Sequence, residues 1–194
     1  VGMIHNVNFN SYNLTTFGYH SYKKFKERLR DYFKVIVVRD PYERLISAFR
    51  DKIEGEGMRF KRAVYNRLRV PVNVEKPDIR GVTTFADFIN YVIEELKMGR
   101  ANRHWSPIWQ LFDPCLLDFD FIVKVETMSQ DASIVLARLF DKKFDLLATH
   151  TNSKRNHTDT KIYYKSISPK NLQTIRHYFS DDFSAFGYDA NRFA

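Results

Sequence analysis

The sequence predicts a single α/β domain over residues 1–194, with a mainly parallel sheet flanked by helices. Short β-branched runs alternate with stretches whose apolar residues recur at helical spacing. One such run, Val35 to Val38, is continuously apolar, as is typical of a strand buried on both faces of a parallel sheet. The chain is 44% hydrophobic and 15% aromatic over 194 residues, which is enough to form a full core.

The other elements follow from periodicity and capping signals. A weak strand at residues 3–8 precedes an amphipathic helix at 21–32. After the strand at 35–38, we expect a helix whose inward face consists of Tyr42, Leu45, Ile46, Phe49 and Ile53. Further along we expect a helix at 85–96 capped by Thr84, a strand at 116–124 and a helix at 131–140. A polar surface loop at 145–164 leads to a last helix, 169–179, capped by Ser168, and to an aromatic tail packed on the core.

The junction between the strand at 35–38 and its helix carries the most chemical information. Asp40 stands at the N-cap and Pro41 at the first helical position. Arg39 lies at the carboxyl end of the strand, where open α/β sheets bind their ligands, beside the free N–H groups and positive dipole end of the helix. Ser47 leans back towards the same end. Together they predict a phosphate-binding corner; the alternative is that Arg39 pairs with a surface carboxylate.

The charge balance predicts an anionic partner. The net charge is +8, and five basic residues without an intervening acid lie between positions 59 and 69: Arg59, Lys61, Arg62, Arg67 and Arg69. A nucleic acid, a membrane surface, a nucleotide or an acidic polysaccharide would each suit this charge. The aromatic residues fall mostly on helix core faces rather than among the basic ones, which disfavours nucleic-acid binding. The basic stretch either grips an anionic polymer or forms a solvated loop.

Five blocks of the sequence, in order, resemble the Golgi carbohydrate sulfotransferases of the branch that holds the chondroitin, dermatan and HNK-1 enzymes. They are RDPYERLISAFRDK from Arg39, FADFINYV from Phe85, His104–Trp105, LFDPCLLDFDFIVKVETM from Leu111 and DFSAFGYD from Asp182. The resemblance spans about residues 5–188. It implies the P-loop-NTPase-like sulfotransferase architecture. It also implies transfer of a sulfuryl group from 3′-phosphoadenosine 5′-phosphosulfate, without a metal, to a glycan hydroxyl. The expected acceptor is a glycosaminoglycan such as chondroitin.

The resemblance also implies residue roles. Arg39 and Ser47 match the contacts that the family makes to the 3′-phosphate of the donor. His5 matches the place of a histidine base in related glycosaminoglycan sulfotransferases, and His104 belongs to a His-Trp pair of the closer family. An imidazole suits a general base because its pKa lies near the working pH. The alternative for each histidine is a structural hydrogen bond. Glu126 is a lesser candidate for the base. The five basic residues named above are expected to contact the acceptor.

One part of the family pattern is missing. A lysine-bearing loop that binds the 5′-phosphosulfate should precede His5, and no Gly-x-x-x-x-Gly-Lys-Ser/Thr loop occurs elsewhere in the chain. We therefore expect a fragment of a longer type II Golgi membrane protein, lumenal in its catalytic domain and anchored only through the missing N-terminal part. The alternative is a naturally short relative that binds glycan or nucleotide without catalysis. The expected partners are the donor and an anionic or neutral glycan, with no nucleic acid.

Overall fold

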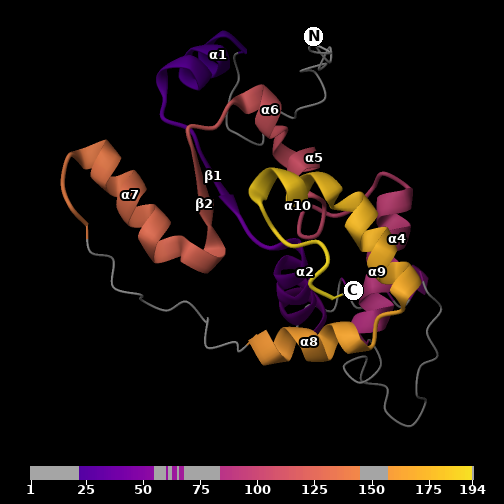
Figure 1. Cartoon of the computed structure of the whole chain (residues 1–194). Helices are drawn as coiled ribbons and strands as arrows, with labels where there is room; N and C mark the ends of the chain where they lie inside the picture. The colour runs from indigo at the N-terminus through magenta and orange to yellow at the C-terminus, as the bar shows by residue number, and fades with distance from the viewer. Residues whose placement is uncertain are drawn as a thin grey trace.

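The protein adopts an α/β fold in which helices surround a small parallel sheet (Figure 1). The structure is a computed structural model that describes residues 22–54, 60, 63–64, 66–67, 84–144 and 157–193. The elements before the first gaps are α1 (Tyr22–Asp31), β1 (Val35–Val38), α2 (Pro41–Phe49) and a π-helical turn, η3 (Arg50–Glu54). The central elements are α4 (Phe85–Lys97), α5 (Ile108–Phe112), α6 (Pro114–Leu117), β2 (Phe121–Lys124), the 3₁₀ turn η5 (Val125–Thr127) and α7 (Met128–Phe140). The last elements are α8 (His157–Lys165), α9 (Pro169–Tyr178) and α10 (Ser180–Phe186).

Strands β1 and β2 pair in parallel, which confirms the expected strand direction. The register runs from Val35 opposite Phe121 to Val38 opposite Lys124. Figure 1 shows the two strands side by side, with α2 continuing from β1 and α7 from β2. Because the strands are parallel, both helices begin at the same edge of the sheet. That edge also holds Arg39.

Strand β1 is buried on one face only, so the expectation of a strand covered on both faces is wrong. Ile36 and Val38 are 4% and 1% exposed, whereas Val37 is 52% exposed. On the neighbouring strand, Val123, which pairs with Val37, is 4% exposed, and Ile122, which pairs with Ile36, is 40% exposed. Paired residues of adjacent strands point to the same face, so the two strands bury opposite faces: β1 buries the face of Ile36 and Val38, and β2 buries the face of Val123.

The main core lies beside the sheet, where α2, α4, α8 and α9 pack together. Its largest fully buried side chains include Tyr42, Phe88 and Trp105. The five inward residues predicted for the helix after β1 are all 4% exposed or less. Many rings meet edge to face, as Tyr42 and Tyr164 do with centroids 5.0 Å apart. This aromatic packing fixes α2, and with it the end of β1, against the rest of the domain.

Helix α4 begins with the capping box that its sequence predicts. The Thr84 hydroxyl accepts a hydrogen bond from the Asp87 N–H at 3.2 Å, and the Asp87 carboxylate accepts one from the Thr84 N–H at 2.9 Å. We expect Thr84→Ala to lower the free energy of unfolding by about 1 kcal/mol, because it leaves an N–H at the helix start without a partner. Urea denaturation measures this loss. Thr84→Ser, which keeps the hydroxyl, should restore most of the stability, and an equal loss in both variants would contradict the capping role.

Three elements differ from expectation. The predicted loop at 145–164 contains α8, because Thr160 and Tyr164 share a buried face that bonds to α2, a tertiary contact that the polar local sequence conceals. The predicted strand at 116–124 begins only at Phe121, since its first residues complete α6. The predicted aromatic tail begins with the short helix α10, whose Phe183 and Phe186 are buried. The strand expected at residues 3–8 lies outside the described residues.

Candidate functional site

The carboxyl end of β1 places Arg39 at the start of α2, as the sequence predicts. The Arg39 side chain is 25% exposed, and its guanidinium lies 4.0 Å from the Glu43 carboxylate, one turn along the helix. Ser47 follows Glu43 by another turn on the same face of α2 and is half-buried. A partly exposed cation and a hydroxyl therefore share one side of the helix. The ion pair between Arg39 and Glu43 is long and easily exchanged for a stronger anionic ligand.

The start of α2 does not offer free N–H groups, and this corrects the sequence interpretation. The Asp40 carboxylate accepts hydrogen bonds from the N–H groups of Tyr42 and Glu43, at 2.8 and 3.2 Å. Pro41 has no N–H, and the N–H of Arg44 continues the helix by bonding to the Asp40 carbonyl. Burial raises the pKa of Asp40, against the effect of these hydrogen bonds. An anion at this corner must therefore be held by side chains rather than by the helix backbone.

Glu126 lies at the carboxyl ends of the two strands and accepts hydrogen bonds from two other segments. One of its carboxylate oxygens accepts the N–H of Asp40 at 2.9 Å, and the other accepts the hydroxyl of Tyr188 at 3.0 Å. Burial and the Glu126 charge raise the pKa of Tyr188, so the phenol keeps its proton and donates. The ammonium of Lys124 lies 4.7 Å from the centre of the Tyr188 ring. Glu126 thus joins the ends of both strands to the C-terminal segment, which is a positioning role.

Residues near the C-terminus complete the corner, and the sequence interpretation had not assigned them roles. Arg192 pairs with Asp40 at 3.5 Å and with Glu43 at 3.3 Å. The Thr160 hydroxyl also donates to Glu43, at 2.7 Å. Tyr188 lies inside the DFSAFGYD block, which marked its segment without indicating a role. No local pattern links residue 192 to residue 40, so only the folded chain reveals these contacts.

His104 lies in the connection between α4 and α5 and is half-buried. Its pKa is lowered below the usual imidazole value by burial and by the positive charges of Lys52 and Arg103. Lys52 belongs to η3, which continues α2 one turn beyond Ser47. The positive charge of Lys52 thus acts on His104, and the neutral form of the imidazole is favoured. His5, the other predicted base, lies outside the described residues.

The remaining arginines of α2 and η3 make structural ion pairs. Arg50 pairs with Glu54 at 3.6 Å, as the helical spacing predicts. Arg44 instead turns to Asp182 on α10, at 3.7 Å, and donates to the Ser106 carbonyl. Burial lowers the pKa of Arg44 to about 10 and raises that of Asp182.

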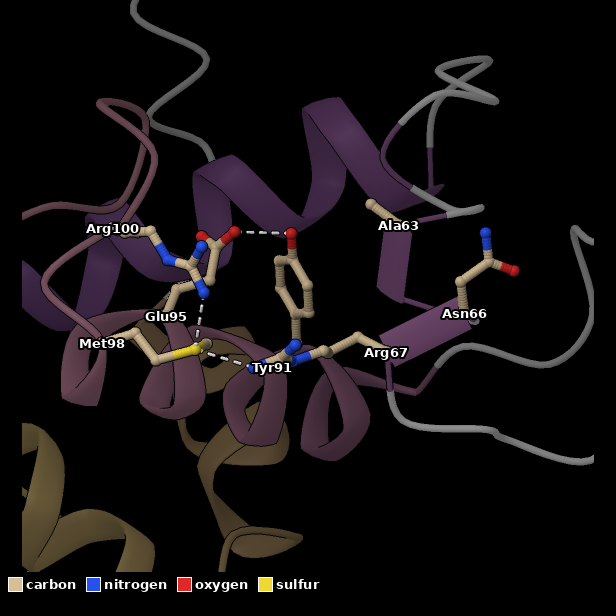
Figure 2. A pocket seen from close by; sticks show the side chains of 7 residues that line it. All are labelled: Ala63, Asn66, Arg67, Tyr91, Glu95, Met98 and Arg100. Carbon is tan, nitrogen blue, oxygen red and sulfur yellow. Dashed lines mark hydrogen bonds between the residues drawn. The ribbon is translucent and has the colours of Figure 1, made fainter.

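Of the five basic residues predicted to bind the acceptor, the structure describes only Arg67. Arg67 donates to the Glu94 carboxylate at 3.0 Å and to the Met98 sulfur at 2.7 Å, and it lines an open pocket beside α4 (Figure 2). Arg59, Lys61, Arg62 and Arg69 lie outside the described residues.

Two further findings concern the described part of the chain. None of its helices combines the length and the apolar character needed to cross a membrane. None of its His, Cys, Asp and Glu side chains gather in groups of three or more suited to holding a metal ion.

Comparison with known proteins gives a consistent family match. A family profile described as "Sulfotransferase family" matches residues 4–189. Carbohydrate sulfotransferase 12 of Mus musculus is 33% identical over 186 residues, which cover 89% of this chain and 44% of that protein. Carbohydrate sulfotransferase 14 of Danio rerio is 33% identical over 171 residues (86% and 46%), and carbohydrate sulfotransferase 9 of Homo sapiens is 30% identical over 195 (92% and 44%). The chain thus spans under half the length of these relatives. No solved structure is significantly similar to it.

Proposed function

This chain belongs to the sulfotransferase family, and we propose that it is part of a carbohydrate sulfotransferase that uses 3′-phosphoadenosine 5′-phosphosulfate as donor. The bond between the sulfur and the oxygen of the 5′-phosphate breaks as a glycan hydroxyl oxygen bonds to that sulfur. The hydroxyl proton passes to a base, and 3′-phosphoadenosine 5′-phosphate leaves. Such a transfer needs alignment of the reactants, neutralisation of phosphate charge and one positioned base.

The observation that carries this proposal is the position of Arg39 and Ser47. They follow β1 at the edge of a parallel sheet where α/β proteins bind ligands, and the family profile covers both. The guanidinium of Arg39 gives a permanent charge and a forked donor to the 3′-phosphate, and the Ser47 hydroxyl gives a neutral hydrogen bond. Glu126 and Arg192 hold the surrounding backbone and carboxylates in place.

For the base we propose a histidine, either His104 or His5. The lowered pKa of His104, to which the charge of Lys52 on η3 contributes, supports His104. Both oxygens of Glu126 already accept hydrogen bonds, so that residue is better suited to positioning.

The finer assignments belong to the same proposal. We propose a single domain of P-loop-NTPase-like architecture, in the branch of the chondroitin, dermatan and HNK-1 enzymes, acting on a glycosaminoglycan such as chondroitin in the Golgi lumen. Relatives named as carbohydrate sulfotransferases favour a catalytic role over a purely glycan-binding one. The 5′ side of the donor requires the lysine-bearing loop expected from the resemblance. A protein in which that loop precedes this chain is called the extended protein below.

We expect calorimetric titration of the chain with 3′-phosphoadenosine 5′-phosphate to show binding that 5′-AMP does not share. Arg39→Ala should weaken that binding about 10-fold to 100-fold, because a charge-assisted hydrogen bond contributes about 1.5–3 kcal/mol. Ser47→Ala should weaken it about 2-fold to 10-fold, the effect of a neutral hydrogen bond.

The matched control is Arg50→Ala, which removes an equal charge from the start of η3, directly after α2. Its ion pair with Glu54 lies away from the proposed corner, so the affinity should change less than 2-fold. Equal losses in Arg39→Ala and Arg50→Ala, or unchanged affinity in Arg39→Ala and Ser47→Ala, would remove the phosphate corner. If the chain binds no nucleotide, the same titration on the extended protein decides: absence of binding there overturns the sulfotransferase proposal.

A further inference from the structure

An open pocket of about 480 Å³ lies beside the C-terminal half of α4, and none of its lining residues belongs to the donor corner. One wall comes from the helical residues Ala63, Asn66 and Arg67, and the other from α4 and the turn that follows it (Figure 2). Its lining residues are Ala63, Asn66, Arg67, Tyr91, Glu95, Met98 and Arg100. An amide, a carboxylate and two guanidinium groups in one shallow hollow suit a sugar ring with an acidic substituent.

The two guanidinium groups converge on an acceptor that satisfies them poorly. Arg67 and Arg100 both donate to the Met98 sulfur, at 2.7 and 3.1 Å, as the dashed lines in Figure 2 mark. A thioether is a weak acceptor, whereas each guanidinium carries five N–H donors in a fork that matches the two oxygens of a carboxylate or sulfate. An anion placed between the two side chains would therefore bond far better than Met98 does.

The acidic neighbours do not cancel this pair of charges. Glu94 bonds to Arg67, but the two side chains are 45% and 44% exposed, and such surface pairs contribute little because water screens them. Glu95 accepts hydrogen bonds from the Tyr91 hydroxyl at 2.6 Å and from the indole N–H of Trp105 at 2.7 Å. The Glu95 carboxylate is thus held by neutral donors of the core.

The pocket is connected with the proposed base through two contacts. The Trp105 side chain that bonds to Glu95 follows His104 directly, and the ring of Phe60 lies 5.5 Å from Trp105 and 6.0 Å from His104. The fully buried Trp105 thus ties the pocket wall to the backbone that carries His104.

We propose that this pocket binds an anionic sugar unit of the acceptor glycan, with its carboxylate or sulfate ester held between Arg67 and Arg100. The inference rests on the proposed sulfotransferase function and names the two side chains that would hold an acidic group of its acceptor. It adds Arg100, which no sequence pattern indicated, to the basic residues that the sequence assigned to acceptor binding.

The test measures fluorescence anisotropy of labelled oligosaccharides with the chain. The probes are unsulfated chondroitin, which carries carboxylates only, carboxyl-reduced chondroitin sulfate, which carries sulfates only, and carboxyl-reduced unsulfated chondroitin, which is neutral. We expect Arg67→Gln and Arg100→Gln each to weaken binding of at least one anionic probe about 10-fold to 100-fold, as expected when a charge-assisted hydrogen bond is lost. The probe that responds identifies the anion. Arg138→Gln on α7, which removes an equal charge from an exposed site, should change the affinity less than 2-fold.

Three results would overturn the subsite: equal losses in all three variants, equal binding of the neutral and anionic probes, or absence of anionic-probe binding by the wild-type chain. Thermal melting of each variant separates loss of binding from loss of fold, and Arg100→Lys, which keeps the charge, should retain part of the affinity. Titration of the same samples with 3′-phosphoadenosine 5′-phosphate tests the donor corner separately. Retained nucleotide binding with unselective glycan binding refutes the subsite alone, whereas the failure of nucleotide binding in the extended protein refutes the function.

Discussion

Replacing His104 by alanine is expected to lower the turnover of the extended protein about 10²-fold to 10⁴-fold, the usual contribution of a general base. The affinity for 3′-phosphoadenosine 5′-phosphate should not change, because the proposed contacts to the 3′-phosphate are Arg39 and Ser47 rather than His104. The half-buried imidazole is followed directly by Trp105, which is fully buried and fixes the backbone at this point. Steady-state kinetics with a glycosaminoglycan acceptor, together with calorimetry, measure the two quantities.

The pH dependence gives a second, independent signature of the same base. Burial and the charges of Lys52 and Arg103 lower the pKa of His104, so the neutral, proton-accepting form persists to more acidic pH than in a free imidazole. The acidic limb of the turnover profile should therefore lie below about pH 6.5, the ordinary histidine pKa. Lys52→Gln removes one of the charges and should move that limb towards higher pH.

The control for His104 is His177→Ala, an exposed histidine on α9, which should retain full turnover. His5→Ala distinguishes the two proposed bases, because only the true base should combine lost turnover with retained nucleotide affinity. Full activity in His104→Ala together with inactivity in His5→Ala would transfer the role to His5. Full activity in both would exclude a histidine base.

The fold was predictable where local signals and burial agree. Thr84 and Asp40 are caps whose sequence context alone identifies the helix starts, and the inward faces of α2 and α4 follow from apolar spacing. Helix α8 was not predictable, because its stability depends on Thr160 and Tyr164 bonding to α2 rather than on its own amphipathicity. The single-sided burial of β1 was also hidden, since a β-branched run reads the same whether one or both faces are covered.

In the candidate site, too, some residues could be predicted from the sequence and others could not. Arg39 was predictable because it directly follows a strand and precedes a cap, a local pattern with a known ligand position. The capping signal already implied that the Asp40 carboxylate accepts the N–H groups at the start of α2. These groups are therefore not available to a ligand, contrary to the sequence interpretation. Arg192 and Arg100 were not predictable, since each acts through partners brought near by folding or through a pocket made by separate segments.

Replacing Asp182 by alanine is expected to lower the free energy of unfolding by about 3–5 kcal/mol, the cost of removing one partner of a buried ion pair. Asp182 is 1% exposed, and its carboxylate accepts the N–H groups of Ile108 and Trp109, both at 2.7 Å, at the start of α5. Its loss leaves these donors without an acceptor and the buried Arg44 without a counter-ion. A domain of this kind has about 5–15 kcal/mol in total, so the variant should unfold at much lower urea concentration.

The double variant Arg44→Met with Asp182→Ala separates the two parts of that cost. With both charges gone, the penalty of an unpaired buried guanidinium disappears, and about 1 kcal/mol remains for the uncapped start of α5. The double variant should therefore be more stable than Asp182→Ala alone, a non-additivity that only coupled residues show. Asp181→Ala, at the exposed neighbouring position, should cost less than about 0.5 kcal/mol. Equal instability of the double and single variants would assign the whole effect to helix capping and leave Arg44 without a role in stability.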